Sequence, residues 1–416
     1  MAIIKTFRAL RPQPELVHRV ASLPYDVINR EEAYQIAKNN PYSFLHVSKA
    51  EIDLDFTVNP YDERVYKKAK DNLNRLVKEK VYLKEEKEIF YLYRQIREDR
   101  TQTGLVVCTS IDDYLKGIIK KHESTQADKE EDRMKHIEST EANTGPVFLV
   151  YKAKDEVNQI VNQWIEAKKP IYNFTSEHKI THLCWVIDDE KVIQQLINIF
   201  AKIDGFYIAD GHHRAAAGVK VGLRKREQLK DYSGKEDFNY FLSVLFPHNE
   251  LYIMDYNRVV KDLFGNSEEE FIQKVSRNFN IERKRGGERY TPTQKHVFGM
   301  YLNNIWYKLT ARPKTFNKND SLEKLDVSIL QNNLLAPILG IKDPRLDQRI
   351  EFVGGIRGLK ELERRVDKGM KVAFVLFPTS IEELMAVADA GKIMPPKSTW
   401  FEPKLYCGIF IHQLSG

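Results

Sequence analysis

In Phe206-Tyr207-Ile208-Ala209-Asp210-Gly211-His212-His213-Arg214-Ala215-Ala216-Ala217, an apolar strand leads within a few residues into an alanine-rich helix. The strand is expected to end near Ala209 and the helix to begin near His213. A helix start attracts anions, because its first backbone N–H groups and the positive end of the helix dipole point outward. Gly211 lets a phosphate approach the backbone closely. The pattern therefore predicts an anion site on a strand-turn-helix unit.

The side chains at this turn add chemistry that suits phosphate. His212, His213 and Arg214 can donate hydrogen bonds to phosphate oxygens, and Asp210 can cap the helix, hold a metal ion or accept a proton. The alternative is that Asp210 only caps the helix and the histidines are ordinary core or surface residues. A function is favoured by the coincidence of all these residues at one turn. Zinc is the weaker alternative, because adjacent histidines project in different directions and no His-Glu-x-x-His spacing or cysteine ligand accompanies them.

A second polar group lies between residues 120 and 146, in a segment that ends abruptly at Gly145-Pro146 before an apolar strand. Asp132 and His136 are four residues apart, so on a helix they share a face, with Arg133 beside them. Such a set suits anion binding and proton transfer. The alternative is a solvated helix with incidental ion pairs. A long polar connection bounded by core strands favours the functional interpretation.

Two further patterns are weaker. Leu23–Val27 and Asn40–His46 read most simply as buried aromatic turns, although Asp26, Ser43 and His46 could line a cleft. Val353–Gly358 ends a strand with paired glycines, and its Arg357 could add a phosphate contact at the start of the next helix. The P-loop, the protein-kinase signatures and a complete G-x-G-x-x-G are all missing from the sequence, so any phosphate handling follows another design.

The alternation of strands and helices along the chain predicts an α/β protein with mixed sheets. Three domains are expected for 416 residues: 1–115, 116–250 and 251–416. Ile89–Arg97 and Gly104–Ile111 have the pattern of a hairpin. Gly222–Asp237 is predicted to be a mobile charged loop, and Tyr406–His412 to be a strand.

Composition limits the function further. The net charge of +6 is dispersed, with no basic block that could serve as a nucleic-acid arm. The three cysteines are far apart in apolar runs, which favours a reducing compartment. A run of 18 apolar residues, as a membrane span requires, does not occur in the sequence. We therefore expect a cytoplasmic enzyme that acts on small anionic molecules, with neither membrane nor nucleic acid as partner.

The sequence also resembles a widespread prokaryotic family, long described as of unknown function, whose members open with Ile-Lys-x-Phe-Arg-Ala-Leu-Arg-Pro. Here that stretch is Ile4–Pro12. The resemblance continues along nearly the whole chain, at Leu23–Val27, Asn40–Val47, Thr103-Gly104, Lys121-His122-Glu123, Asp132-Arg133, Asn143–Phe148 and Asp210–Arg214. The family is in turn similar to free-serine kinases of the ParB-like group, which share the Asp-Gly-His-His-Arg turn. Some members of the family are held to be pyrophosphate-dependent serine kinases.

The resemblance implies a ParB/sulfiredoxin-like core around residues 206–222 and phosphorylation of free L-serine to O-phosphoserine. The donor would be pyrophosphate or, as an alternative, a nucleotide such as ATP or ADP, with Mg²⁺ as cofactor. A phosphatase acting on a small phosphorylated metabolite and a ParB-like regulator that binds a nucleotide or DNA remain as alternatives. Glu123 is the expected base and Asp210 the second choice.

The expected roles are catalysis, metal binding, phosphate binding and substrate binding. Catalysis is assigned to Glu123, Asp210 and His213, and the metal to Asp210. Phosphate binding is assigned to Gly211, His212, His213, Arg214, Arg133, His136 and Arg357. Substrate binding is assigned to Lys121, His122, Thr125, Asp132, Thr140 and Asn143.

Overall fold

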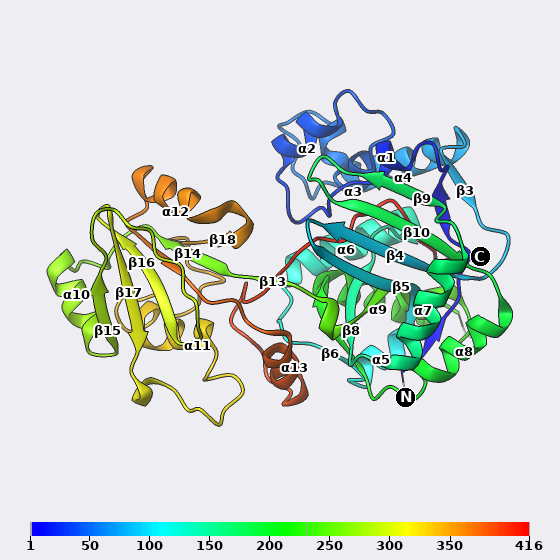
Figure 1. Ribbon diagram of the computed structural model, residues 1–416. Coiled ribbons are helices and arrows are strands. Elements are labelled where there is room, and N and C mark those ends of the chain that lie inside the picture. The colour runs from blue at the N-terminus through cyan, green and yellow to red at the C-terminus, as the bar shows by residue number, and fades with distance from the viewer. Residues whose placement is uncertain (1, 230, 416) are drawn as a thin grey trace. The chain divides into compact units, whose positions relative to one another are not determined.

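The computed structural model describes residues 2–229 and 231–415, which form two compact units (Figure 1). The first unit consists of Met1–Lys121, Thr125–Leu251 and Pro403–Gly416, and the second of His122–Ser124 and Tyr252–Glu402. Both mix helices with sheets, so the predicted α/β class with mixed sheets is confirmed.

The first unit is built on a mixed sheet in the order β6-β11-β8-β12-β5-β4-β10-β9, with β1 paired to β5. Its strands are β1 (Ile4–Lys5), β4 (Phe90–Arg97), β5 (Arg100–Ser110), β6 (Ile119–Lys120), β8 (Val147–Tyr151), β9 (Tyr172–Thr175), β10 (Thr181–Ile187), β11 (Phe206–Asp210) and β12 (Tyr240–Pro247). The β11–β6 and β12–β8 pairs are parallel and the other pairs antiparallel. The predicted β4–β5 hairpin is confirmed.

Helices pack against this sheet through an apolar core. The helices of the first unit are α1 (Val17–Val20), α2 (Arg30–Ala37), α3 (Leu45–Ser48), α4 (Glu63–Lys78), α5 (Ile111–Leu115), α6 (Ala127–Thr140), α7 (Asp155–Ala167), α8 (Glu190–Phe200) and α9 (His212–Gln228). Val157 and Trp164 of α7 and Leu196 and Phe200 of α8 join the same buried cluster as the strand residue Phe206. This burial of one apolar face holds α7 and α8 on the sheet.

Two short strand pairs complete the first unit: β2 (Leu10–Pro12) with β3 (Tyr82–Lys84), and β7 (Ala142–Asn143) with β21 (His412–Gln413). The pairing of β21 with β7 returns the end of the chain to the first unit. Because β5 pairs with β12 as well as with β1 and β4, residues from the first two predicted domains share one sheet. The structure thus has two units where the sequence predicted three domains.

The second unit contains an antiparallel sheet in the order β15-β17-β16-β19-β14-β18. Its strands are β14 (Tyr256–Val260), β15 (Phe279–Arg283), β16 (Val297–Leu302), β17 (Ile305–Ala311), β18 (Ile350–Gly354) and β19 (Val372–Val375), and β13 (Ile253–Met254) pairs separately with β20 (Trp400–Phe401). The helices are α10 (Glu268–Ser276), α11 (Asp326–Leu330), α12 (Gly358–Asp367) and α13 (Ile381–Asp389). Leu362 of α12 packs with Val259, Ala373 and Val375 in its core.

Two sequence predictions about local structure are corrected. The segment predicted as a mobile loop from Gly222 is helical as far as Gln228. Gly222 belongs inside this helix because a Cβ there would lie 2.5 Å from the Phe238 carbonyl oxygen, so its missing side chain serves packing and does not end the helix. The predicted strand Tyr406–His412 is reduced to isolated bridges and β21, because Gly408 has a φ of +83° that interrupts the extended chain.

Candidate active site

The turn between β11 and α9 has the predicted geometry. β11 ends at Asp210, and Gly211 is the N-cap residue of α9, with a φ of +93°. A Cβ at Gly211 would lie 3.1 Å from the guanidinium of Arg214, so both the backbone conformation and the close approach favour glycine. Glycine offers no capping side chain, and the positive end of the helix dipole at this start favours an anion.

Arg214 is the most buried cation of this turn. Its Nη1 donates to the Pro146 carbonyl, and its Nη2 donates to Asp210 Oδ2 at 3.1 Å. Burial alone would lower the pKa of Arg214, but the carboxylates of Asp210 and Asp26 raise it above its ordinary value. Its buried Nε has no hydrogen-bond partner within residues 2–229 and 231–415. A permanently charged group with a spare donor suits an anion.

Asp210 lies between two cations. Its Oδ1 is 3.6 Å from Lys404 Nζ, and its Oδ2 accepts the hydrogen bond from Arg214. Arg214 belongs to the first unit, and so does Lys404, because the last residues of the chain return there. The sequence prediction missed Lys404, since nothing in a lysine 190 residues after the turn indicates that it returns to Asp210.

Arg133 of α6 provides a second fixed cation. Its Nη2 lies 2.6 Å from Asp132 Oδ2, and its guanidinium lies 3.9 Å from the ring centre of Tyr25. Asp132 also accepts a hydrogen bond of 2.9 Å from the Tyr66 hydroxyl. Burial lowers the pKa of Arg133, but Tyr25 and Asp132 raise it by more. The arginine is therefore charged and held in place from two sides.

The two arginines line one small cavity of about 30 Å³, wholly within the first unit. A cavity of this size holds one or two water molecules. Of the predicted residues, Arg133, His136, Asn143 and Arg214 line it. Tyr25, Ser48 and Cys407 line it as well and were not predicted as site residues. The Leu23–Val27 motif was the only signal for Tyr25. We call these lining residues the arginine cavity.

His213 and His136 are held in defined tautomers by backbone groups. His213 Nε2 accepts a 3.1 Å hydrogen bond from the Gln126 backbone N–H, which requires a neutral ring with its proton on Nδ1. His136 Nε2 lies 3.0 Å from the Val47 carbonyl and must donate to it. Burial lowers the pKa of His136 to about 4 and that of His212 to about 3. At neutral pH these rings therefore contribute hydrogen bonds and no positive charge.

The other predicted residues have varied surroundings. The Thr125 hydroxyl donates to Glu130, and the Thr140 hydroxyl donates to the His136 carbonyl at 2.7 Å, so both serve local structure here. Asn143 Oδ1 accepts from the Leu242 N–H at 3.0 Å. Lys121 is exposed, with its ammonium 4.7 Å from the ring centre of Tyr114.

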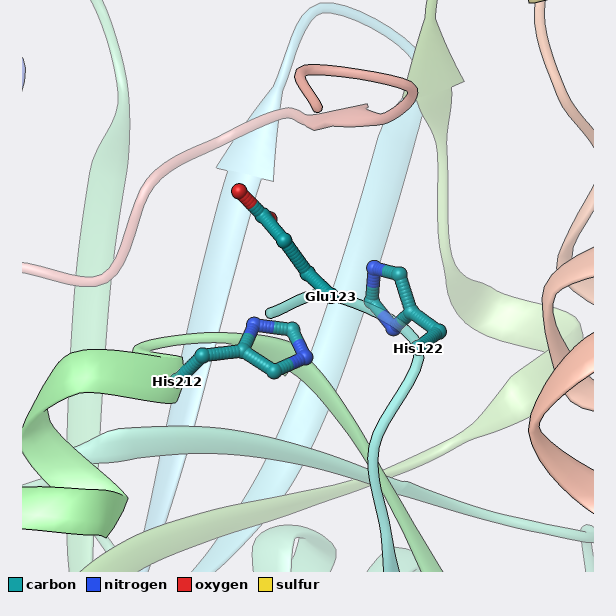
Figure 2. A group of neighbouring side chains, drawn as sticks. All are labelled: His122, Glu123 and His212. Atoms are coloured by element: carbon teal, nitrogen blue, oxygen red, sulfur yellow. The ribbon is translucent and has the colours of Figure 1, made fainter. Parts of the chain in front are cut away.

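Three predicted residues belong to the second unit. Arg357 is exposed at the end of a 3₁₀ turn, Gly355–Arg357. His122 and Glu123 follow β6 and are grouped with the second unit. Figure 2 shows their side chains together with that of His212, which comes from the first residue of α9. The His122 carbonyl accepts a 2.8 Å hydrogen bond from the Met394 N–H of the same unit.

The neutral state of His136 predicts an acid-sensitive fold. Its folded pKa of about 4 lies below the ordinary 6.5, so its contribution is complete above pH 6.5 and lost as pH falls toward 4. The difference corresponds to on the order of 3 kcal/mol. Urea unfolding between pH 8 and 4 should show His136→Gln losing less stability than the wild type. The exposed His178→Gln should follow the wild type, and parallel profiles for all three would contradict the prediction.

Fold and site together define an α/β protein with a candidate anion site, made by the start of one helix and two buried arginines. The chain belongs to the family described as "Protein of unknown function (DUF1015)", whose model matches residues 4–328. This confirms the family membership predicted from the sequence. There is no match among curated proteins.

Several solved structures are similar to the chain. A free serine kinase in complex with AMP has 13% sequence identity and a TM-score of 0.36, over 72% of this chain and 86% of that chain. A conserved hypothetical protein from Pyrococcus furiosus has 14% identity and a TM-score of 0.36, over 74% and 94%. A C-terminally truncated SbnI from Staphylococcus aureus has 11% identity and a TM-score of 0.38, over 72% and 84%. In the part of the chain that the structure describes, no helix is both long enough and apolar enough to cross a membrane.

Proposed function

We propose that the protein transfers a phosphoryl group from pyrophosphate, or from a nucleotide, to the hydroxyl of free L-serine. The observation that carries this proposal is the start of α9, where a glycine is the N-cap residue and the charged guanidinium of Arg214 lies in the first turn, with Arg133 on the same arginine cavity. Phosphoryl transfer asks mainly for charge neutralisation and positioning, and this arrangement supplies both. The sequence resemblance to serine kinases supports the choice of acceptor.

In the proposed reaction the serine oxygen attacks the terminal phosphorus of the donor. A new P–O bond to serine forms while the bond to the bridging oxygen breaks, and the leaving phosphate keeps the electron pair. Arg214, with its spare Nε donor, and the N–H groups at the start of α9 would offset charge on the phosphate oxygens. His213, protonated on Nδ1, would add a neutral donor.

Mg²⁺ fits the turn poorly at Asp210. Both oxygens of this carboxylate face cations, Arg214 at 3.1 Å and Lys404 at 3.6 Å, so a divalent ion there would meet two positive charges. We therefore assign Asp210 to positioning Arg214. Mg²⁺ would supply charge neutralisation to the phosphates of the donor, and no step is derived through it.

Glu123 is the proposed base, taking the proton of the serine hydroxyl. Its segment is short: the neighbours Lys121 and Thr125 both belong to the first unit. Gln126, three residues beyond Glu123, donates its backbone N–H to His213. Only three residues of chain separate Glu123 from the backbone group that bonds to His213 in the first turn of α9. This short connection limits how far Glu123 can lie from the helix start, which supports its role.

The direct test is to incubate the purified protein with L-serine, Mg²⁺ and either pyrophosphate, ATP or ADP, and to follow O-phosphoserine by ³¹P NMR. We expect phosphoserine with at least one donor, in a molar ratio of one to one with the leaving group. If no donor yields phosphoserine, the proposal is wrong. Phosphate release that does not depend on serine would instead indicate a hydrolase.

A further inference from the structure

The second unit contains a pocket of about 510 Å³, and Glu123 is the only one of its lining residues that the chemistry above uses. All of its lining residues belong to the second unit, including Glu123 and Ser124. Its volume falls in the range of small-molecule sites, roughly 300–1,000 Å³. Part of its wall is Gln331 and Asn332, from a π-helical turn, Gln331–Leu335, that continues α11. Such wider turns occur frequently at functional sites.

Ser328 of α11 supplies a polar group that the protein itself leaves unsatisfied. Its side chain lines the pocket and is only 3% exposed, yet its Oγ has no hydrogen-bond partner in the described parts of the chain. A buried hydroxyl without a partner costs free energy, on the order of 1–3 kcal/mol. A ligand in the pocket that bonds to Ser328 would recover this energy.

The charges of the pocket distinguish between classes of ligand. Five charged side chains line it, and two of them, Arg345 and Asp343, pair with each other at 2.7 Å. Outside this pair, the exposed Lys342 and Glu323 line the pocket with opposite charges. One cation beside one carboxylate disfavours a polyanion such as pyrophosphate. It suits a zwitterion, whose carboxylate can meet the lysine and whose ammonium can meet one glutamate.

The wall that carries Met394 to Pro396 is held by a buried arginine. Arg258 of β14 donates to the carbonyls of Pro396 at 3.3 Å and Lys397 at 3.1 Å, and it lies over the ring of Phe352. Met394 in turn donates its N–H to the His122 carbonyl. The backbone next to Glu123 is thereby fixed relative to the pocket, as a preformed site requires.

We propose that this pocket binds the acceptor, a free α-amino acid with a hydroxyl side chain, as its zwitterion. Lys342 binds the carboxylate, Glu323 the ammonium and Ser328 a further polar atom, and Glu123 keeps the role of base given to it in the proposed function. The assignment rests on the proposed function for the reaction, but binding of the amino acid can be measured without it.

The test uses Lys342→Met and Ser328→Ala in the full chain, with Lys360→Met on α12 as the matched surface control. We expect the KM for L-serine to rise about tenfold in both pocket variants, with the KM for the donor unchanged. Ser328→Ala should fold at least as stably as the wild type, because its hydroxyl bonds to no described group. Lys360→Met should behave as the wild type.

A second measurement separates this inference from the reaction. Equilibrium dialysis with radiolabelled L-serine, without donor, should give a dissociation constant that both pocket variants raise about tenfold. If the wild type makes no phosphoserine but binds serine, and both variants raise the dissociation constant, the kinase proposal fails and the assignment of the pocket to the amino acid is supported. If the wild type binds no serine in dialysis, or if Lys342→Met and Ser328→Ala keep the wild-type constants, the pocket assignment is overturned.

Discussion

Replacing Arg214 with glutamine is expected to slow phosphoserine formation by about 10³-fold, the largest effect predicted for a single side chain of the first unit. The guanidinium is charged at every accessible pH, and its Nε–H group has no hydrogen-bond acceptor in the described parts of the chain. Glutamine can keep one hydrogen bond to the Pro146 carbonyl but brings no charge. The loss should fall on kcat, because Arg214 is expected to bind the phosphate oxygens more strongly in the transition state than in the ground state.

The control for this variant lies on the same helix. Arg224 pairs with Glu138 at 2.9 Å on the surface, and Arg224→Gln makes the same chemical change away from the helix start. An exposed pair of this kind contributes about 0–1 kcal/mol, so activity and melting temperature should stay near wild type. Arg214→Lys keeps the charge but not the fork and should recover only part of the rate. If the folded Arg214→Gln variant turns over at the wild-type rate, Arg214 has a structural role only and the prediction is wrong.

Much of the first unit could be predicted because its signals are local. The apolar run of β11, the glycine with positive φ and the alanines of α9 lie within twelve consecutive residues. Their spacing therefore fixes a strand, a turn and a helix start. The four-residue spacing of Asp132 and His136 likewise placed both on α6, and Arg133 with them.

Contacts between distant parts of the chain could not be predicted in this way. Lys404 approaches Asp210, and Cys407 enters the arginine cavity, only because the last residues return to the first unit and pair β21 with β7. A single sequence carries no sign of that return, because its strand pair is two residues long. Ser328 was missed for another reason: its importance lies in having no partner, which only packing reveals.

The role of a glycine is a second property that the sequence alone does not predict, because it depends on neighbouring residues. Gly211 and Gly222 are both in or next to α9, and the sequence predicts that Gly211 lies in the turn before the helix and that Gly222 begins a loop after it. The structure separates them, because Gly211 has a φ of +93° while Gly222 is helical and pressed against Phe238 and Ile111. A glycine signals a need for space or for unusual backbone geometry, and only the neighbours decide which.

Glutamine at position 123 is expected to lower kcat by about 10²–10⁴-fold, the range that general base catalysis contributes. The change is nearly isosteric and removes only the ability to take a proton. The KM for serine should change little, in contrast to Lys342→Met, which should raise that KM and spare kcat. Glu131→Gln, an exposed residue of α6, is the matched control and should be silent.

A chemical rescue distinguishes a base from a positioning residue at this place. Glu123→Ala leaves room for a small carboxylate, so added formate should restore part of the rate, while chloride at equal ionic strength should not. Asp210→Ala, at the second choice for the base, should respond to neither, because the Asp210 carboxylate acts through Arg214 at 3.1 Å and Lys404 at 3.6 Å. Formate rescue of Asp210→Ala, with none for Glu123→Ala, would exchange the two roles. Asp210 would then be the base that takes the serine proton.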